Sequence, residues 1–161
     1  MRRLALGDDA IAAIHADVAR WGALDVETGC MLLSSVGDDM ITVVALAGAS
    51  GIKRHQRHLH ITGEALDPLL EYAEDHDLQL RAQLHSHKHD AFLSEIDKAG
   101  NIRMRGFQAA VVPDYAAPPR SPERWGWWQF DGLDWHPHPH AEAGPHRTRL
   151  ITFDAGGIHE H

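Results

Sequence analysis

The sequence is poor in several features, and each shortage excludes a class of protein or site. Its 161 residues include one cysteine, Cys30, so neither an internal disulfide nor a zinc site built from several thiolates is possible. No apolar run reaches the roughly 18 residues of a membrane-spanning helix, and we expect no membrane partner. Asp8 and Asp9 interrupt the N-terminal apolar run, so we expect no signal peptide and a reducing, cytoplasmic setting.

Basic residues are also scarce. The chain has 15 Lys and Arg against 23 Asp and Glu, a formal net charge of −8, which argues against nucleic acid as a partner because phosphates require a basic surface. The one concentrated basic stretch, residues 53–57, could contact an acidic partner, but we favour a solvated loop. A hydrophobic content of 43% over this length is typical of one soluble globular domain.

The spacing of apolar residues predicts a mixed α/β (α+β) protein. Two helices are expected to begin at acidic caps, Asp8 or Asp9 in the first and Asp67 before Pro68 in the second, and to end near residues 22 and 75. Strands are expected at residues 27–36, 40–49, 59–62, 78–84, 107–112, 125–130 and 149–153. Gly37 lies between the first two strands, which we interpret as a hairpin.

The strand at residues 78–84 has the clearest pattern. Leucine or alanine alternates there with a polar residue at every step, as in a strand with one buried face, and the strand leads directly into His85. We expect one domain over residues 1–135. Residues 136–161, rich in histidine and proline, are expected to form a tail with a possible last strand of the same domain.

Histidine is the abundant residue, with 14 copies, and the pair His-x-His occurs six times. A pair alone therefore carries little information. Two histidines that are two positions apart on a strand do point to the same side, however, and can bind one ion. The pairs at residues 58/60 and 136–140 are interpreted as surface histidines. His85 and His87 differ because they end the half-buried strand and precede Ser94-Glu95-Ile96-Asp97.

Two interpretations of Ser94 and Asp97 remain open on local pattern. Asp97 could be a third metal ligand, because a catalytic zinc site takes three protein ligands and leaves a position for water. Ser94 and Asp97 also match an N-terminal capping box, which needs no metal. The two interpretations are compatible, since capping would hold the helix that carries Asp97. A cupin site, which also uses His-x-His, is disfavoured because residues 91 and 92 are Ala and Phe where it needs Glu.

Together these residues resemble the motif of the JAMM (JAB1/MPN/Mov34) metalloproteases, in its compact prokaryotic form. Glu27 in VETGCMLL, then His85-Ser86-His87, then Ser94-x-x-Asp97 follow that motif, and the expected order of elements resembles its fold from about residue 5 to about residue 135. Two departures occur: Lys88 stands where the motif has proline, and the segment between His87 and Ser94 is one residue shorter.

The resemblance implies an MPN-like fold, a curved mixed sheet flanked by helices, and a zinc-dependent isopeptidase or peptidase. It implies one Zn²⁺ held by His85, His87 and Asp97, with Glu27 as general base for a water and Ser94 as donor to the oxyanion. The implied substrate is the C-terminus of a ubiquitin-like protein or its conjugates, with E1- or E2-like enzymes as possible partners. A thiol mechanism through Cys30 is disfavoured, because a cysteine in an apolar strand is usually a core residue.

Two other functions are kept as alternatives. An MPN-like domain can act as a scaffold without catalysis, but such domains generally lack the ligands that are present here. A zinc-buffering protein would depend on the many histidines of the tail. Metal stoichiometry distinguishes them, because an enzyme binds about one tight ion and a buffer binds several weak ones.

Overall fold

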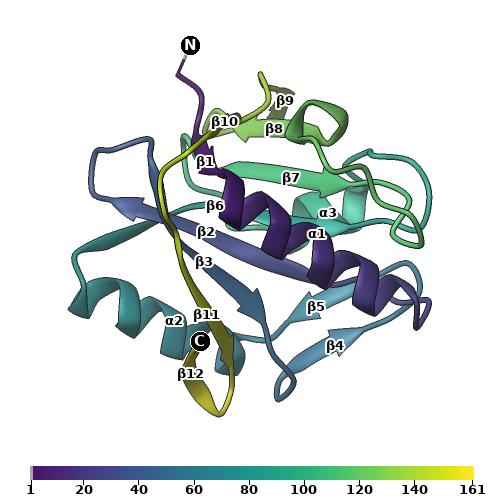
Figure 1. Cartoon of the computed structure of the whole chain (residues 1–161), viewed down its shortest axis with the longest axis horizontal. Coiled ribbons are helices and arrows are strands. Elements are labelled where there is room, and N and C mark those ends of the chain that lie inside the picture. The colour runs from purple at the N-terminus through teal and green to yellow at the C-terminus, as the bar shows by residue number, and fades with distance from the viewer. Residues whose placement is uncertain (1) are drawn as a thin grey trace.

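The computed structural model describes residues 2–161 and shows a mixed α+β fold, which confirms the expected class (Figure 1). The helices are α1 (Asp8–Gly22), α2 (Gly63–Asp75), α3 (Glu95–Gly100) and the 3-10 turn η1 (Pro122–Arg124). The main sheet contains β2 (Gly29–Ser35), β3 (Ile41–Ala47), β6 (Leu78–Ser86), β7 (Gln108–Val112), β8 (Gly126–Phe130), β9 (Trp135–Pro137), β11 (Arg149–Asp154) and β12 (Gly157–Glu160). Two small sheets pair β1 (Ala5–Gly7) with β10 (Glu142–Gly144), and β4 (Ile52–Arg54) with β5 (Leu59–Ile61).

The main sheet has the strand order β12-β11-β3-β2-β6-β7-β8-β9 and mixes both orientations. β2 and β3 form the expected hairpin, with Gly37 at φ 79° in the turn, a conformation that glycine adopts without steric cost. β2 also pairs antiparallel with β6, and β6 pairs in parallel with β7. The end of β6 is therefore held between two neighbouring strands in the middle of the sheet.

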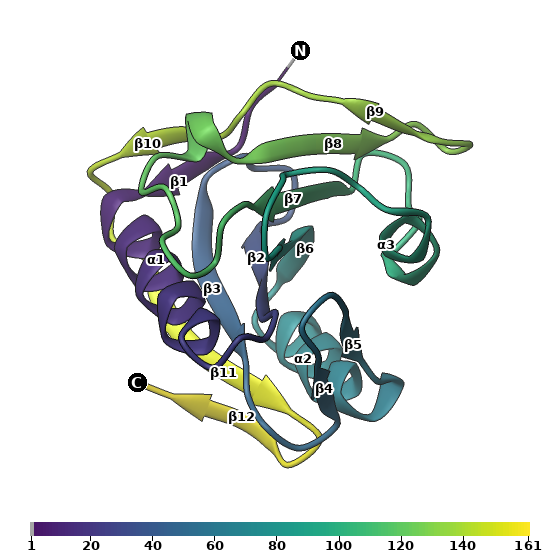
Figure 2. The ribbon, with the colours of Figure 1, turned by 90° about the vertical axis from the view of Figure 1, so that its right-hand side faces the viewer.

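The sheet is buried on both faces because α1 and α2 cover opposite sides of it (Figure 2). Along β2, Cys30 and Leu32 point toward the cluster that contains α1, whereas Met31 and Leu33 point toward the cluster that contains α2. Alternate residues of a strand face opposite sides, so a strand covered on both sides reads as a continuous apolar run. Cys30 is fully buried in this core and its pKa is raised by burial, which disfavours it as a nucleophile.

Three local predictions were wrong. Neither Asp8 nor Asp9 caps α1, because the N-cap residue is Gly7 and both aspartates lie in the first turn. The Asp9 carboxylate instead accepts from the amide of Thr148 at 2.8 Å. α2 begins at Gly63 and not at Asp67, because the Thr62 hydroxyl caps it by accepting from the Ala65 amide at 3.3 Å. Pro68 therefore lies inside the helix. β4 was expected to be loop, but its residues pair antiparallel with β5 across the short connection at residues 55–58.

Residues 136–161 contribute strands to the folded core. β11 pairs in parallel with β3, and Ile151 and Phe153 are fully buried against α2. β12 then pairs with β11, and β10 pairs with β1 at the other end of the chain. Within residues 2–161, no helix has the length and apolar character needed to cross a bilayer.

Candidate metal centre

The end of β6 places two histidines on the same side of the chain. His85 is the second-last residue of β6 and pairs with Gly29 of β2, and His87 comes directly after Ser86, the last residue of the strand. The intervening Ser86 points the other way, where its hydroxyl accepts from the amide of Thr28 at 2.9 Å. A strand alternates its side chains, so this arrangement directs both imidazoles into one site.

The two imidazoles and the carboxylate of Asp97 converge. His85 Nε2 and His87 Nε2 are 3.1 Å apart, and Asp97 Oδ2 lies 3.2 Å from the first and 3.1 Å from the second. His85 is 3% exposed, His87 is 6% exposed, and the Asp97 side chain is 11% exposed. The three ligand-type atoms therefore form a nearly equilateral triangle that is largely shielded from solvent.

This triangle has the dimensions of one face of a tetrahedral metal site. Ligand atoms at about 2.0–2.1 Å from a tetrahedral Zn²⁺ are separated by about 3.3 Å, close to the separations found here. Without a cation, the two Nε2 atoms have each other and Asp97 Oδ2 as partners, and at least one Nε2 must carry a proton to form a hydrogen bond among them. The residues present fit a metal ion in number, type and spacing.

The orientation of His87 is set by a backbone contact. Its Nδ1 lies 3.0 Å from the carbonyl oxygen of Asp90, to which the ring N–H donates. In the neutral ring this leaves the lone pair on Nε2, the atom that faces His85 and Asp97. Burial alone would lower the pKa of His87, but its hydrogen bond to Asp97 and the charge of Glu27 outweigh burial and raise it.

Asp97 performs two roles at the start of α3. The Ser94 hydroxyl accepts from the Asp97 amide at 3.0 Å, and Asp97 Oδ2 accepts from the Ser94 amide at 3.0 Å, which is a complete capping box. The same Oδ2 faces both imidazoles. Burial would raise the pKa of Asp97, but the hydrogen bonds from His85 and His87 hold it well below its usual range. The cap thus orients the carboxylate toward the histidines.

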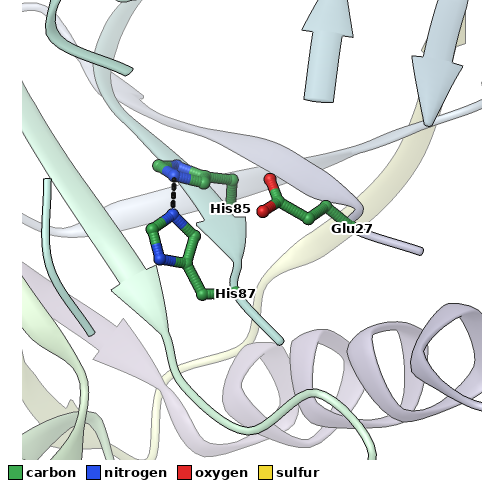
Figure 3. Close-up of side chains that lie close together, drawn as sticks. All are labelled: Glu27, His85 and His87. Atoms are coloured by element: carbon green, nitrogen blue, oxygen red, sulfur yellow. Dashed lines mark hydrogen bonds between the residues drawn. The ribbon is translucent and has the colours of Figure 1, made fainter. Parts of the chain in front are cut away.

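Glu27 comes from a different part of the chain, the residues just before β2, and its carboxylate points toward the two imidazoles (Figure 3). One carboxylate oxygen of Glu27 and a nitrogen of each histidine all lie within 4.8 Å of one another, although no hydrogen bond joins Glu27 to either ring. Glu27 is 2% exposed, and its Oε1 is buried without a hydrogen-bond partner. Burial raises the pKa of Glu27 to about 8.

Two carboxylates, those of Glu27 and Asp97, therefore lie beside the pair of His85 and His87. The histidines of residues 136–140 make separate contacts. His136 lies 2.7 Å from the exposed carboxylate of Asp131, and His138 contacts the Arg2 carbonyl oxygen. Buried polar atoms with no partner are rare, and residues 2–161 contain four others besides Oε1 of Glu27. The Glu27 oxygen differs from these because it lies next to two imidazoles, in a cluster that could hold a metal ion.

Two cavities flank the cluster. One, of about 400 Å³, lies beside His85 and Asp97 and is lined by His58, Leu59 and Ile96. The other, of about 210 Å³, is lined by Glu27, His87, Lys88, Phe92, Ser94 and Arg57. His58, expected at the surface, is half-buried, and burial lowers its pKa.

Sequence reasoning missed the role of Arg54, which lies within the basic stretch at residues 53–57. Its guanidinium donates to the carbonyl oxygens of Ala47 and Gly48, each at 2.6 Å, and to Thr28 Oγ1 at 3.1 Å, and it stacks over Trp21. Arg54 is thus an internal anchor beside Glu27. All of its partners are distant in sequence except the carbonyls six and seven residues earlier, so no local signal could reveal it.

No protein-family model matches the sequence, and no curated protein matches it either. Solved structures do. The solution structure of a protein from Desulfitobacterium hafniense aligns with a TM-score of 0.67 at 14% identity, covering 89% of this chain and 94% of that chain. A JAB1/MPN domain protein from Archaeoglobus fulgidus aligns with a TM-score of 0.53 at 14% identity, covering 89% of this chain and 100% of that chain. The solution structure of a Salinibacter ruber protein has a TM-score of 0.55 at 21% identity, covering 86% and 91%. At these identities the comparisons show the fold, which is JAB1/MPN-like.

Proposed function

We propose that this chain is a zinc-dependent peptidase of the JAMM type, which cleaves a peptide or isopeptide bond at the C-terminus of a ubiquitin-like protein. One observation carries the proposal: a buried carboxylate oxygen of Glu27 without a partner lies beside the triangle of His85, His87 and Asp97. The triangle supports a metal ion, and the unpaired carboxylate supports proton transfer next to it. The JAB1/MPN-like fold agrees with this assignment.

Zn²⁺ is the proposed ion, held by His85, His87 and Asp97. Two imidazoles and one carboxylate match the ligand types and the count of catalytic zinc sites. When bound, the ion would supply Lewis-acid chemistry, activating a water and polarising the substrate carbonyl. The Asp90 carbonyl that orients His87 is the kind of outer contact that keeps a ligating ring in place.

Glu27 is proposed as the general base and later as the acid. One oxygen of its carboxylate lies within 4.8 Å of a nitrogen of each imidazole, close enough to reach a water in the metal site. In the metal-free protein the pKa of about 8 keeps the group mostly protonated at neutral pH, because burial disfavours the charge. A cation held by His85, His87 and Asp97 would lower that pKa and favour the ionised carboxylate, which can accept a proton from water. The same atom then returns the proton to the leaving amine.

Ser94 is proposed as a donor to the oxygen of the attacked carbonyl. Its hydroxyl accepts the Asp97 amide hydrogen, so its own hydrogen remains available to donate. Ser94 and Glu27 line the same cavity of about 210 Å³, which supports a role for both at one scissile bond. Capping and catalysis thus use different parts of one hydroxyl group.

The substrate assignment rests on the motif resemblance. A ubiquitin-like C-terminal tail and its conjugates are the proposed substrate, and E1- or E2-like enzymes of the same pathway are the proposed partners. The two cavities on either side of the cluster, about 400 and 210 Å³, provide space for chain on both sides of a scissile bond. A scaffold without catalysis is the outcome if no cleavage is found.

The test combines metal content with cleavage. The purified chain is expected to bind about one zinc ion, measured by mass spectrometry, and to cleave a reporter fused to the tail of a ubiquitin-like protein. His87→Ala should lose both the metal and the cleavage, whereas His136→Ala, an exposed histidine beside an aspartate, should keep both. Several weakly bound zinc ions that persist in His87→Ala would contradict the proposal and favour zinc buffering. One bound zinc without cleavage of a panel of tails would favour the scaffold.

A further inference from the structure

The loop that carries Glu27 has no regular structure of its own. Residues 26–28 lie between the end of α1 and the start of β2, outside any helix or strand. On the β2 side, the Thr28 amide donates to Ser86 Oγ at 2.9 Å, and Arg54 donates to Thr28 Oγ1 at 3.1 Å. The Glu27 amide donates to the His55 carbonyl oxygen at 2.9 Å. Other segments of the chain therefore determine where the Glu27 carboxylate lies.

On the α1 side, Asp25 makes the corresponding contacts. Lys88 Nζ lies 2.9 Å from Asp25 Oδ1, and the hydroxyl of Tyr115 lies 3.0 Å from the same oxygen. The side-chain amide of Gln56 donates to Asp25 Oδ2. The hydrogen bonds from Lys88 and Gln56 lower the pKa of Asp25 to about 2, so it is a carboxylate at neutral pH. Three segments that are distant in sequence thus meet at one carboxylate, two residues before Glu27.

The backbone around Asp25 is also constrained. Its φ is 60°, in the left-handed region that residues other than glycine adopt rarely, although Asp and Asn are enriched there. The buried Tyr115 is tied to the metal-ligand segment, because its amide donates to the His87 carbonyl oxygen at 3.0 Å. A Cβ on Gly22 would lie 2.0 Å from the Tyr115 carbonyl oxygen, so the end of α1 is pressed against Tyr115. Asp25 is therefore held in a defined place relative to His87.

Lys88 is the residue that stands where the JAMM motif has proline. Proline restricts the backbone at its own position, whereas lysine has no such restriction. Here the lysine side chain instead reaches the Glu27 loop, directly after the metal-ligand candidate His87. We propose that Lys88, through its ion pair with Asp25, is a positioning residue that holds the Glu27 carboxylate at its distance from His85 and His87. The inference rests on the proposed function for its catalytic consequence, but not for the anchoring itself.

Hydrogen exchange of two backbone amides tests the anchoring without substrate. The Glu27 and Thr28 amides each have a partner from another segment, so their exchange rates report how often this loop opens. In Lys88→Met both rates are expected to rise about two- to fivefold, the effect of losing a half-exposed ion pair. Asp25→Asn, which keeps a residue suited to positive φ, should give a similar rise, and the double variant should add little more.

Lys98→Met is the matched control. Lys98 pairs with Glu95 at 3.3 Å and follows Asp97 by one residue, as Lys88 follows His87, but it does not contact the Glu27 loop. It should leave the Glu27 and Thr28 exchange rates unchanged. Lys88→Arg, which can remake the ion pair, should restore rates near those of the unaltered protein.

The catalytic consequence is measured separately, as the rate of cleavage of a reporter fused to the tail of a ubiquitin-like protein. Lys88→Met should lower kcat about two- to fivefold with KM and zinc content unchanged, and Lys88→Arg should recover it. Unchanged amide exchange in Lys88→Met would overturn the anchoring, and faster exchange with unchanged kcat would overturn the positioning of the base. If the unaltered protein cleaves nothing, the proposed function fails, while the exchange rates still decide whether Lys88 anchors the loop.

Discussion

Replacing Glu27 with glutamine should make the metal-free protein more stable at alkaline pH. The carboxyl of Glu27 has an ordinary pKa of 4.5 and a pKa of about 8 in the folded protein, because burial disfavours its charge. A carboxyl whose folded pKa is raised stabilises the fold when it is protonated, and this contribution is lost as pH rises from the unfolded to the folded pKa. The stability of the metal-free protein should therefore fall between about pH 4.5 and pH 8.

The size of this effect follows from the shift. Each unit of pKa difference corresponds to about 1.4 kcal/mol, so a shift from 4.5 to about 8 costs on the order of 5 kcal/mol once Glu27 is fully ionised. Glutamine has nearly the same shape and cannot ionise. Its amide is also buried without a partner, which costs a constant amount at every pH. The ionisation of Glu27 is therefore isolated by comparing how steeply the free energy of unfolding of each protein changes with pH, and not by comparing the two free energies at one pH.

The assay is urea unfolding in the presence of a chelator, at steps from pH 5 to pH 8.5. The stability of Glu27→Gln relative to the unaltered protein should increase with pH at up to about 1.4 kcal/mol per unit, until it levels off near pH 8. Glu71→Gln, at an exposed position of α2, is the control. Its free energy of unfolding, plotted against pH, should run parallel to that of the unaltered protein. Parallel curves for Glu27→Gln as well would show that the Glu27 carboxyl is not desolvated, and would remove the physical basis for its proposed role.

Three further outcomes are expected. Glu27→Gln should keep zinc but cut cleavage by about 10²–10⁴, the usual contribution of a general base, so unchanged turnover in a zinc-loaded sample would contradict the mechanism. Ser94→Ala should keep zinc, slow turnover by about 10²–10³ and cost about 1 kcal/mol from the lost cap of α3; loss of zinc would instead show that the hydroxyl serves only to orient Asp97. Gly22→Ala should destabilise the fold by several kcal/mol, because the added Cβ would lie 2.0 Å from a backbone oxygen, whereas Gly100→Ala, at the end of α3 with open space around it, should be near neutral in thermal unfolding.

The parts of the site that are local in sequence could be predicted from it. His85 and His87 lie on the same side because alternate residues of a strand do, and the strand itself was visible from its alternation. The capping box of Ser94 and Asp97 depends only on residues three apart, and the structure contains it. The hairpin of β2 and β3 could likewise be predicted from their apolar runs and from Gly37 between them, because turn geometry and burial act on neighbouring residues.

Tertiary structure decided everything that depends on distant partners. Asp97 reaches both imidazoles only because α3 is placed against the end of β6, and Glu27 is near His85 only because β2 pairs with β6. A strand at residues 149–153 was expected within a tail, but the sequence did not show that this strand, β11, lies beside β3, where its apolar residues are covered by α2. The ion pair of Lys88 with Asp25 had no signature in the sequence either. Local pattern determines which backbone shape a segment prefers, whereas the contacts that desolvate Glu27 and align it with the histidines exist only after long-range pairing has buried them together.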